Sequence, residues 1–483
     1  NQYSRDPRGE ELVKDLIHEL RLSGKRFVDP HFPPDMSSIF VDPAAGYANA
    51  HVAQTSRRDQ DPFLAGVKEI HWQRPEHICD VNATPKVFSG TISPDDVVQG
   101  RLGNCYFLAA LSSAAKGDDD ILVNDLVVEE GADVGLYGVK FYVNGRWTTV
   151  IVDDLFPCVK QGAEWRPVFA SPRANLEDPS GEKELWSLIF EKAWAKLHLS
   201  YEATNEGQTD DTHNYLTGGV CSQMPINCDS DADWASVLEL TDPDNFAFLS
   251  TSVRDGMADK GLLHGHSYSV LDAKESRVSP GLRLVQVRNP WGKREWCGDF
   301  GRNSGLWSPE LQKEMREVLM EDGTFCMKWA DFSRHFAVIN VCDPRQLCGL
   351  FDDGRARVVG ALAYWVAERT AGGLPGHVTF GYNPRFELVC AGSEVIVSVY
   401  QPDPRYAELV RDALPLEIYV YVFDSDPGPP ELYQPLLVPA AGGGRGVGGP
   451  REVLRLDDAR QAAARIQVEA GRRYWLVAAA WGP

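Results

Sequence analysis

The chain has 483 residues, of which 43% are hydrophobic, and its formal net charge is -21 at pH 7. This length accommodates about two to four domains, and the apolar content supports packed cores rather than general disorder. The acidic balance argues against a nucleic-acid-binding protein, because such proteins rely on cationic contacts with phosphate. No apolar run reaches the roughly 20 residues of a membrane-spanning helix.

Helical patterns occur near the start of the sequence and alternate with strand patterns from about residue 85 to 200. Apolar residues at helical spacing predict a helix over residues 9–21. Small apolar residues predict a buried helix over 105–115, and an amphipathic pattern predicts another over 185–199. Between these two, the dipeptide Asn144-Gly145 separates two apolar runs and predicts a β-hairpin.

Strands become prominent after residue 201, and from about residue 345 helical patterns nearly vanish. The later strands are short, alternating and bounded by turns, which is typical of an all-β antiparallel sandwich. The predicted strands are 246–250, 267–271, 282–287, 378–380, 386–389, 394–400, 416–423, 453–456, 466–468 and 474–478. The sequence as a whole therefore predicts an α+β protein.

The ten cysteines are spread along the chain and form no C-x-x-C pair or zinc-like Cys/His cluster. Such sparse use is unlike a disulfide-stapled secreted scaffold. Free thiols in a reducing compartment fit this pattern, so we expect a cytoplasmic location. The chain begins at Asn1 without a signal-peptide pattern, and a start without Met suggests an upstream region in a longer protein.

Cys105 is the sharpest candidate for chemistry because it opens the predicted helix over 105–115. A thiol at a helix N-terminus lies where the helix dipole and free N–H groups favour the thiolate, which is the nucleophilic form. The same N–H groups can stabilise an oxyanion, and the side-chain amide of Gln99 can act as a second donor. The alternative is a buried cysteine that only packs as a small hydrophobic residue.

Two further residues could act with this thiol. His266 comes directly before a predicted strand, and Asn289 comes directly after another. An imidazole can take the thiol proton and return it to a leaving amine, while an amide orients the ring through its other nitrogen. The order Cys, His, Asn is that of papain-like enzymes. Trp291 could cover the His–Asn hydrogen bond, and the competing base His264 lacks the following strand pattern.

Three long motifs contain these residues: Gln-Gly-Arg-Leu-Gly-Asn-Cys-Tyr-Phe-Leu-Ala-Ala (99–110), Gly-His-Ser-Tyr-Ser-Val (265–270) and Arg-Asn-Pro-Trp-Gly (288–292). Further motifs lie at 27–33, 72–75, 184–196, 216–220 and 321–325. Together they resemble the calpain family of cysteine proteases over about residues 27–343. The resemblance implies a two-lobed papain-like core, with Cys105 on one lobe and His266 and Asn289 on the other.

The resulting domain prediction has four parts. An N-terminal lead-in covers residues 1–84, the first lobe 85–200 and the second lobe 201–343. A β-sandwich that resembles the family's C2-like domain covers 345–483. The calmodulin-like EF-hand domain of the family has no counterpart in this sequence.

The resemblance also implies a calcium site in the first lobe, since calcium closes the two lobes of these proteases. Asp96 and Glu184 match the carboxylate ligands of that site. Calcium takes about six to eight oxygen ligands, so backbone carbonyls and water must supply the rest.

The second lobe departs from the family pattern. Glu295 and Asp322 match ligand positions, but Arg302 and Thr324 stand where acids are usual. The loss of two carboxylates and the gain of a cation should weaken or abolish calcium binding there.

These observations lead to one expected function and two alternatives. We expect a calcium-modulated cysteine endopeptidase that cuts protein substrates at limited sites and binds no nucleic acid. A transglutaminase-type acyl transferase uses the same Cys-then-His order, but its third residue is normally Asp. The other alternative is a catalytically silent scaffold, whose β-sandwich makes weak contacts with partners or membranes.

Overall fold

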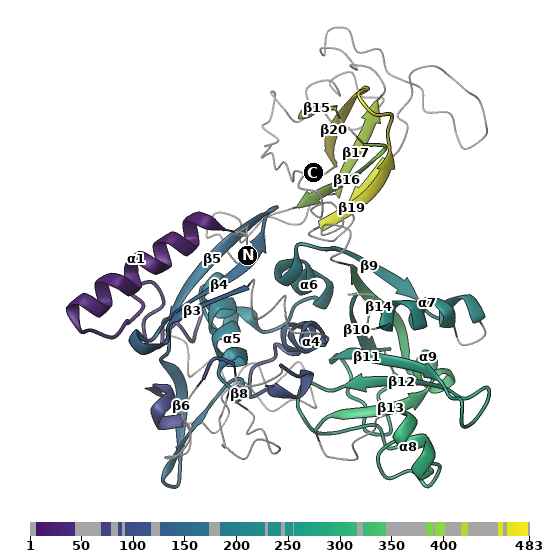
Figure 1. Cartoon of the computed structure of the whole chain (residues 1–483), viewed down its shortest axis with the longest axis horizontal. Coiled ribbons are helices and arrows are strands. Elements are labelled where there is room, and N and C mark those ends of the chain that lie inside the picture. Colours follow the sequence, from purple (N-terminus) through teal and green to yellow (C-terminus); the bar gives the residue numbers. More distant parts are fainter. Residues whose placement is uncertain are drawn as a thin grey trace. The chain divides into compact units, whose positions relative to one another are not determined.

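The computed structural model describes residues 6–43, 69–78, 86–88, 92–116, 126–172, 184–227, 230–242, 247–254, 256–315, 322–343, 383–389, 392–400, 417–423, 453–456 and 461–481. The chain forms two compact units, Asn1–Asp352 and Asp353–Pro483 (Figure 1). The first unit mixes helices with antiparallel sheets, which confirms the predicted α+β class. In the described parts of the chain, no helix is long and apolar enough to cross a membrane.

The first unit contains most of the regular structure. Its described helices are α1 (Pro7–Ser23), α3 (Pro75–Ile78), α4 (Cys105–Ala114), α5 (Trp186–Leu197), α6 (Thr209–Thr217), α7 (Asp231–Thr241), α8 (Pro309–Met315) and α9 (Trp329–His335), with 3-10 turns η2 (Pro94–Asp96), η4 (Ala132–Val134) and η5 (Glu202–Thr204). Its strands are β1 (His71–Gln73), β2 (Val97–Val98), β3 (Val127–Gly131), β4 (Leu136–Val143), β5 (Arg146–Asp153), β6 (Phe156–Gln161), β7 (Glu164–Pro167), β8 (Ser171–Pro172), β9 (Val220–Pro225), β10 (Phe248–Val253), β11 (Ser267–Glu275), β12 (Arg283–Arg288), β13 (Thr324–Lys328) and β14 (Phe336–Asp343).

Local sequence signals set the ends of several elements. Helix α1 is longer than predicted because Asp6 caps it by accepting a hydrogen bond from the Gly9 N–H, and Pro7 suits the first helical position. Gly24, at φ 64°, ends the helix in the left-handed conformation. The hairpin of β4 and β5 is confirmed, and Asn144 and Gly145 have φ of 49° and 80°, as a type I′ turn requires.

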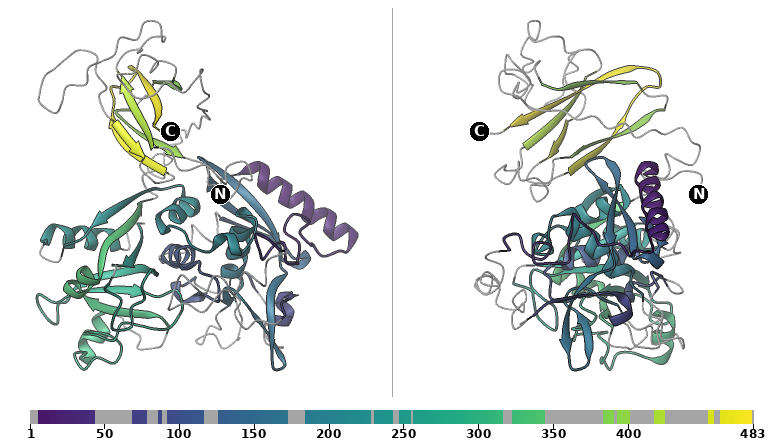
Figure 2. Two further views of the ribbon diagram at one scale, coloured as in Figure 1. Left: turned by 180° about the vertical axis from the view of Figure 1, so that it is seen from behind. Right: turned by 90° about the vertical axis from the view of Figure 1, so that its left-hand side faces the viewer.

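Helices α4 and α5 lie at the centre of the first unit (Figures 1 and 2). Their predicted existence is confirmed, and almost every side chain on both is buried. The rings of Phe107 on α4 and Trp194 on α5 stack with centroids 4.9 Å apart, and Phe141 of β4 contacts the same tryptophan. These aromatic contacts fix α4, which begins at Cys105, within a rigid core.

A six-stranded antiparallel sheet packs against the other side of α4. Its strand order is β13-β12-β11-β10-β14-β9, and α4 contacts β10 and β11 at its centre. The hydroxyl of Ser269 on β11 donates a 2.8 Å hydrogen bond to the carbonyl of Ala109 on α4. The start of β11 and the end of β12 lie at the same end of the sheet. This end of the sheet therefore lies near α4.

The second unit consists of strands in its described part. A four-stranded antiparallel sheet and a two-stranded one are formed by β15 (Arg385–Val389), β16 (Glu394–Tyr400), β17 (Glu417–Phe423), β18 (Val453–Leu456), β19 (Gln461–Gln467) and β20 (Arg473–Trp481). Side chains from both sheets share one core, which includes Val422, Ile466 and Tyr474. This is the packing of a β-sandwich. The strand predicted at 378–380 lies outside the described residues.

Candidate active site

Cys105 is the first residue of α4, and its side chain is 7% exposed. The residue before it, Asn104, occupies the N-cap position without making a side-chain capping bond. Helix N–H groups and the helix dipole are therefore available to stabilise negative charge near the thiol.

His266 and Asn289 come from neighbouring strands of the six-stranded sheet, before β11 and after β12. His266 Nε2 and Asn289 Oδ1 are 2.7 Å apart, and both residues are buried. The Asn289 amide nitrogen donates to the carbonyls of Lys293 (2.8 Å) and Arg294 (3.0 Å). These two bonds orient the amide oxygen toward the imidazole, so that Nε2 acts as the donor in the His–Asn bond.

His266 interacts with the Cys105 thiol, and Nδ1 is the ring nitrogen left for this role because Nε2 is bonded to Asn289. Within the described structure, His266 Nδ1 is buried and has no oxygen or nitrogen partner. Burial by itself raises the pKa of Cys105, but the charge of His266 and hydrogen bonds with His266 and Ser267 outweigh burial and hold that pKa below its ordinary value. A thiolate and an imidazolium therefore stabilise one another at this site.

Aromatic rings enclose the imidazole. The ring centroids of His266 and Trp291 are 5.0 Å apart, and Tyr268 meets the imidazole edge-on at the same distance. The Trp291 backbone N–H also donates a 3.0 Å bond to Asn289 Oδ1. Trp291 thus lies where it limits the access of water to the His–Asn bond. His264, the competing base, is exposed.

Gln99 lies on the segment that leads into α4. Its side-chain nitrogen donates a 2.7 Å bond to the Leu102 carbonyl, and its backbone N–H donates to the Pro290 carbonyl at 2.8 Å. The primary amide has a second N–H. Its predicted role as an oxyanion donor stays a prediction.

Asp96 and Glu184, the predicted first-lobe calcium ligands, lie side by side. Their carboxyl groups share a hydrogen bond, and Trp186 Nε1 donates to Glu184 Oε2 at 3.0 Å. Burial, followed by the negative charge of Asp95, raises the pKa of Asp96, although hydrogen bonds with Ser93 and Glu184 act in the opposite direction. Two adjacent carboxylates fit a calcium ion, because carboxylate oxygens are the ligands that calcium prefers.

The rest of such a coordination shell would have to come from elsewhere. In the described part of the chain, no three His, Cys, Asp or Glu side chains group as a metal-binding cluster. Backbone carbonyls and water are the ligands that calcium accepts in addition to carboxylates.

The predicted second-lobe ligands are engaged differently. Glu295 Oε2 lies 3.2 Å from the Arg302 Nε, and its Oε1 accepts a 3.2 Å bond from the Gly323 N–H. Asp322 Oδ1 accepts a 2.7 Å bond from the N–H of Thr324. The residues present do not fit a calcium ion here, because the guanidinium already neutralises Glu295.

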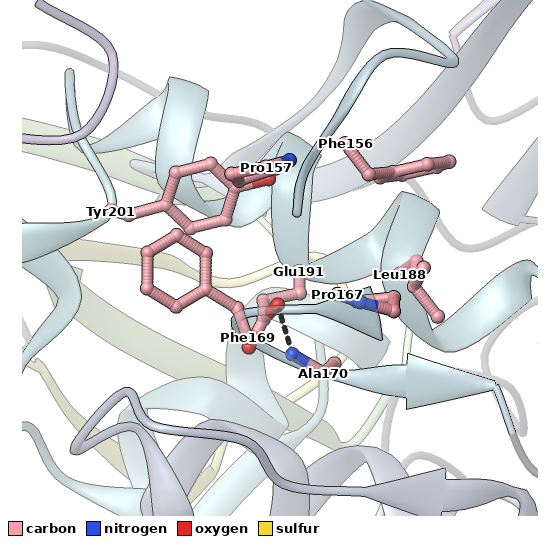
Figure 3. Close-up of a pocket in the computed structure, with 8 residues that line it drawn as sticks. All are labelled: Phe156, Pro157, Pro167, Phe169, Ala170, Leu188, Glu191 and Tyr201. Carbon is pink, nitrogen blue, oxygen red and sulfur yellow. Dashed lines mark hydrogen bonds between the residues drawn. The ribbon is translucent and has the colours of Figure 1, made fainter. Parts of the chain in front are cut away.

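Glu191 was not singled out by the sequence, although it lies on the buried face of α5. Its two carboxyl oxygens accept hydrogen bonds from Asn104 Nδ2 (2.7 Å) and from the Ala170 N–H (2.8 Å), the latter drawn in Figure 3. Burial raises the pKa of Glu191 to about 7, although both hydrogen bonds lower it. A cavity of about 10 Å³ adjoins this carboxyl group. The sequence signal that could have identified Glu191 is an acidic residue on the otherwise apolar face of the predicted helix.

A thiol at a helix N-terminus, an imidazole beside it and an amide that orients the ring are the groups that papain-like cysteine proteases use. Residues 27–343 match the model of the calpain family of cysteine proteases, and the chain belongs to this family.

Relatives extend the match beyond the protease core. The chain is 32% identical over 393 residues to the calpain-type cysteine protease DEK1 of Arabidopsis thaliana, which covers 78% of this chain and 16% of that protein. It is 30% identical over 387 residues to the calpain-2 catalytic subunit of Mus musculus, which covers 77% of this chain and 50% of that protein. The chain thus spans no more than half the length of these two relatives.

Proposed function

We propose that this chain is a cysteine endopeptidase that hydrolyses peptide bonds in protein substrates. Cys105 is the nucleophile, His266 the general base and acid, and Asn289 the amide that orients the imidazole. The observation that carries the proposal is the 2.7 Å bond between His266 Nε2 and Asn289 Oδ1, beside a thiol whose pKa is lowered.

The acylation half of the reaction follows from this arrangement. The Cys105 thiolate attacks the peptide carbonyl carbon, and the carbonyl oxygen takes up the negative charge. The Cys105 backbone N–H and the Gln99 side chain are the donors proposed for this oxyanion. His266 Nδ1 then gives its proton to the leaving amine, which departs as the new N-terminus and leaves a thioester on Cys105.

Deacylation uses the same groups in reverse. Neutral His266 removes a proton from water, and the resulting hydroxide attacks the thioester carbonyl. Collapse of the second oxyanion releases the carboxylic acid product and restores the thiolate and the imidazolium. Asn289 keeps Nε2 bonded throughout, so that only Nδ1 exchanges protons with the reacting atoms.

We further propose that calcium modulates the enzyme through the Asp96 and Glu184 carboxylates only. Their crowding supports a first-lobe site, and the ion pair of Arg302 with Glu295 argues against a second one. When bound, calcium would supply positive charge that neutralises the two carboxylates.

Cleavage of a casein substrate by wild-type protein and by Cys105→Ala tests the proposal. We expect the variant to lose at least about 1,000-fold in kcat, because the nucleophile is gone. Cys297→Ala, which removes an exposed thiol, is the matched control and should keep wild-type activity. Unchanged cleavage by Cys105→Ala would contradict the proposal. Incorporation of an amine into glutamine without peptide cleavage would instead favour an acyl transferase.

A further inference from the structure

Arg288 is a fully buried arginine at the end of β12, immediately before Asn289. Its guanidinium leaves the six-stranded sheet and enters the region that precedes and includes α4. Nε lies 3.2 Å from Asp95 Oδ1, and Nη2 donates to the carbonyls of Val97 (2.8 Å) and Asp95 (3.3 Å). Nη1 donates to Ser112 Oγ at 3.2 Å.

These partners lie on both sides of the candidate nucleophile in the chain. Asp95 and Val97 belong to η2 and β2, which lead into the segment before Cys105, and Ser112 lies on α4 itself. The Ser112 hydroxyl in turn donates to the Pro94 carbonyl at 3.2 Å. The Arg288 side chain therefore connects the end of β12, beside Asn289, with two other elements. These are β2 and α4, the helix that carries the thiol.

Other hydrogen bonds also connect the six-stranded sheet and its loops with α4 and the segment before it, but each involves fewer residues. The Gln99 N–H donates to the Pro290 carbonyl and Ser269 Oγ to the Ala109 carbonyl, each at 2.8 Å. Each of these connects one residue to one residue, whereas Arg288 makes four bonds to three residues. The backbone of Arg288 stays paired with Ser269 and Thr324 on the adjacent strands, so loss of the side chain would remove the link from this end of β12 to η2, β2 and α4 while leaving the sheet paired.

We propose that Arg288 is a positioning residue, which holds the His266–Asn289 pair in register with Cys105 by anchoring the end of β12 to η2, β2 and α4. The inference rests on the proposed function of these three residues. A displacement of about 1 Å at a reacting group can lower the rate about 100-fold, so weakening an anchor beside Asn289 should have a large effect on turnover.

The planar guanidinium is needed for this role. Its five donors point in fixed directions and satisfy a carboxylate, two carbonyls and a hydroxyl at once. Lysine keeps the charge, but its ammonium has three donors on one atom and cannot reach partners that diverge in this way. Arg288→Lys therefore separates the geometry of the anchor from its charge.

The experiment measures kcat and KM on a fluorogenic peptide for wild type, Arg288→Lys and Asp95→Asn. It also measures the rate of Cys105 alkylation by iodoacetamide from about pH 5 to 9, because alkylation reports the thiolate that His266 stabilises. Mass spectrometry of the Cys105 peptide gives that rate, with the exposed Cys297 as an internal reference. Arg283→Lys, on the other end of β12, is the matched control.

We expect Arg288→Lys to lower kcat about 100-fold with little change in KM, and to shift the Cys105 alkylation profile to higher pH. Asp95→Asn should lower kcat about 10-fold and shift the profile in the same direction, because it weakens one charge-assisted bond. Arg283→Lys should leave both properties as in wild type. A change that merely lowered global stability would not move the alkylation profile measured well below the unfolding temperature.

Wild-type kcat and a wild-type alkylation profile in folded Arg288→Lys and Asp95→Asn would overturn the inference, as would an equal shift in Arg283→Lys. If Arg288→Lys does not fold, Asp95→Asn decides, since Asp95 is partly exposed. If wild type cleaves nothing, the proposed function fails, and the alkylation profiles still show whether Arg288 positions His266 against Cys105.

Discussion

Replacing Glu191 by glutamine is expected to change how the stability of this protein depends on pH. The carboxyl group is buried on α5 and accepts bonds from Asn104 and from the Ala170 N–H. Asn104 Oδ1 is buried and has no partner in the described structure. After a flip of the Asn104 amide, a protonated Glu191 can donate to that oxygen and still accept from Ala170. Glutamine makes the same two bonds at every pH.

The magnitude follows from the pKa of Glu191, which burial raises from an ordinary value of 4.5 to about 7. A raised pKa means that the folded state binds the proton more tightly than the unfolded state. The stabilisation is therefore complete below the unfolded pKa and is lost as the pH rises through the folded pKa. Between about pH 5 and about pH 8 the loss amounts to about 2.5 kcal/mol in the free energy of unfolding.

Urea unfolding followed by tryptophan fluorescence, at several pH values, measures this difference. The free energy of unfolding of Glu191→Gln, relative to wild type, should rise by about 2.5 kcal/mol from about pH 5 to about pH 8. Glu164→Gln, which changes an exposed glutamate on β7, is the matched control and should parallel wild type. If Glu191→Gln and wild type keep a constant difference over this range, the reasoning about burial and proton binding is refuted.

Three further changes test the site and its surroundings. Asn289→Ala should lower kcat about 100-fold, measured on a fluorogenic peptide, because the ring of His266 loses its orienting acceptor. Glu184→Gln should weaken calcium binding at least about 10-fold in isothermal titration calorimetry, since one of two carboxylate ligands is lost. Arg302→Gln should lower the free energy of unfolding by about 3 kcal/mol in urea, because it leaves the buried Glu295 without its counter-charge.

Each of these changes has a matched control in the chain. Asn340→Ala, on β14 of the same sheet, should keep the wild-type kcat, and equal losses in both asparagine variants would contradict a specific role for Asn289. Glu164→Gln should bind calcium as wild type does, and unchanged binding by Glu184→Gln would remove that residue from the ligand set. Arg166→Gln breaks an exposed ion pair and should cost less than about 1 kcal/mol. A similarly small decrease in the free energy of unfolding for Arg302→Gln would contradict the stabilising role of the ion pair between Arg302 and Glu295.

The sequence determined the local structure well wherever one element carries its own signal. Spacing and small side chains predicted α4, and Asn144-Gly145 predicted the β4–β5 turn. Strand β19 was only partly predicted, at 466–468, because its alanine-rich start around 462–464 lacks the alternation and branched residues that mark strands. The candidate residues Cys105, His266 and Asn289 also followed from their places at the ends of predicted elements.

Tertiary structure alone decided which distant groups meet, because contacts between remote segments leave no trace in local periodicity. The sequence could not show that Arg288 is buried against Asp95, that the pKa of Glu191 lies near 7 beside Asn104, or that Asp96 and Glu184 share a hydrogen bond. Each depends on burial and on partners brought together by the fold. By itself, the sequence singled out the candidate residues for the chemistry, and the packing of α4 against the sheet decided how these residues are held.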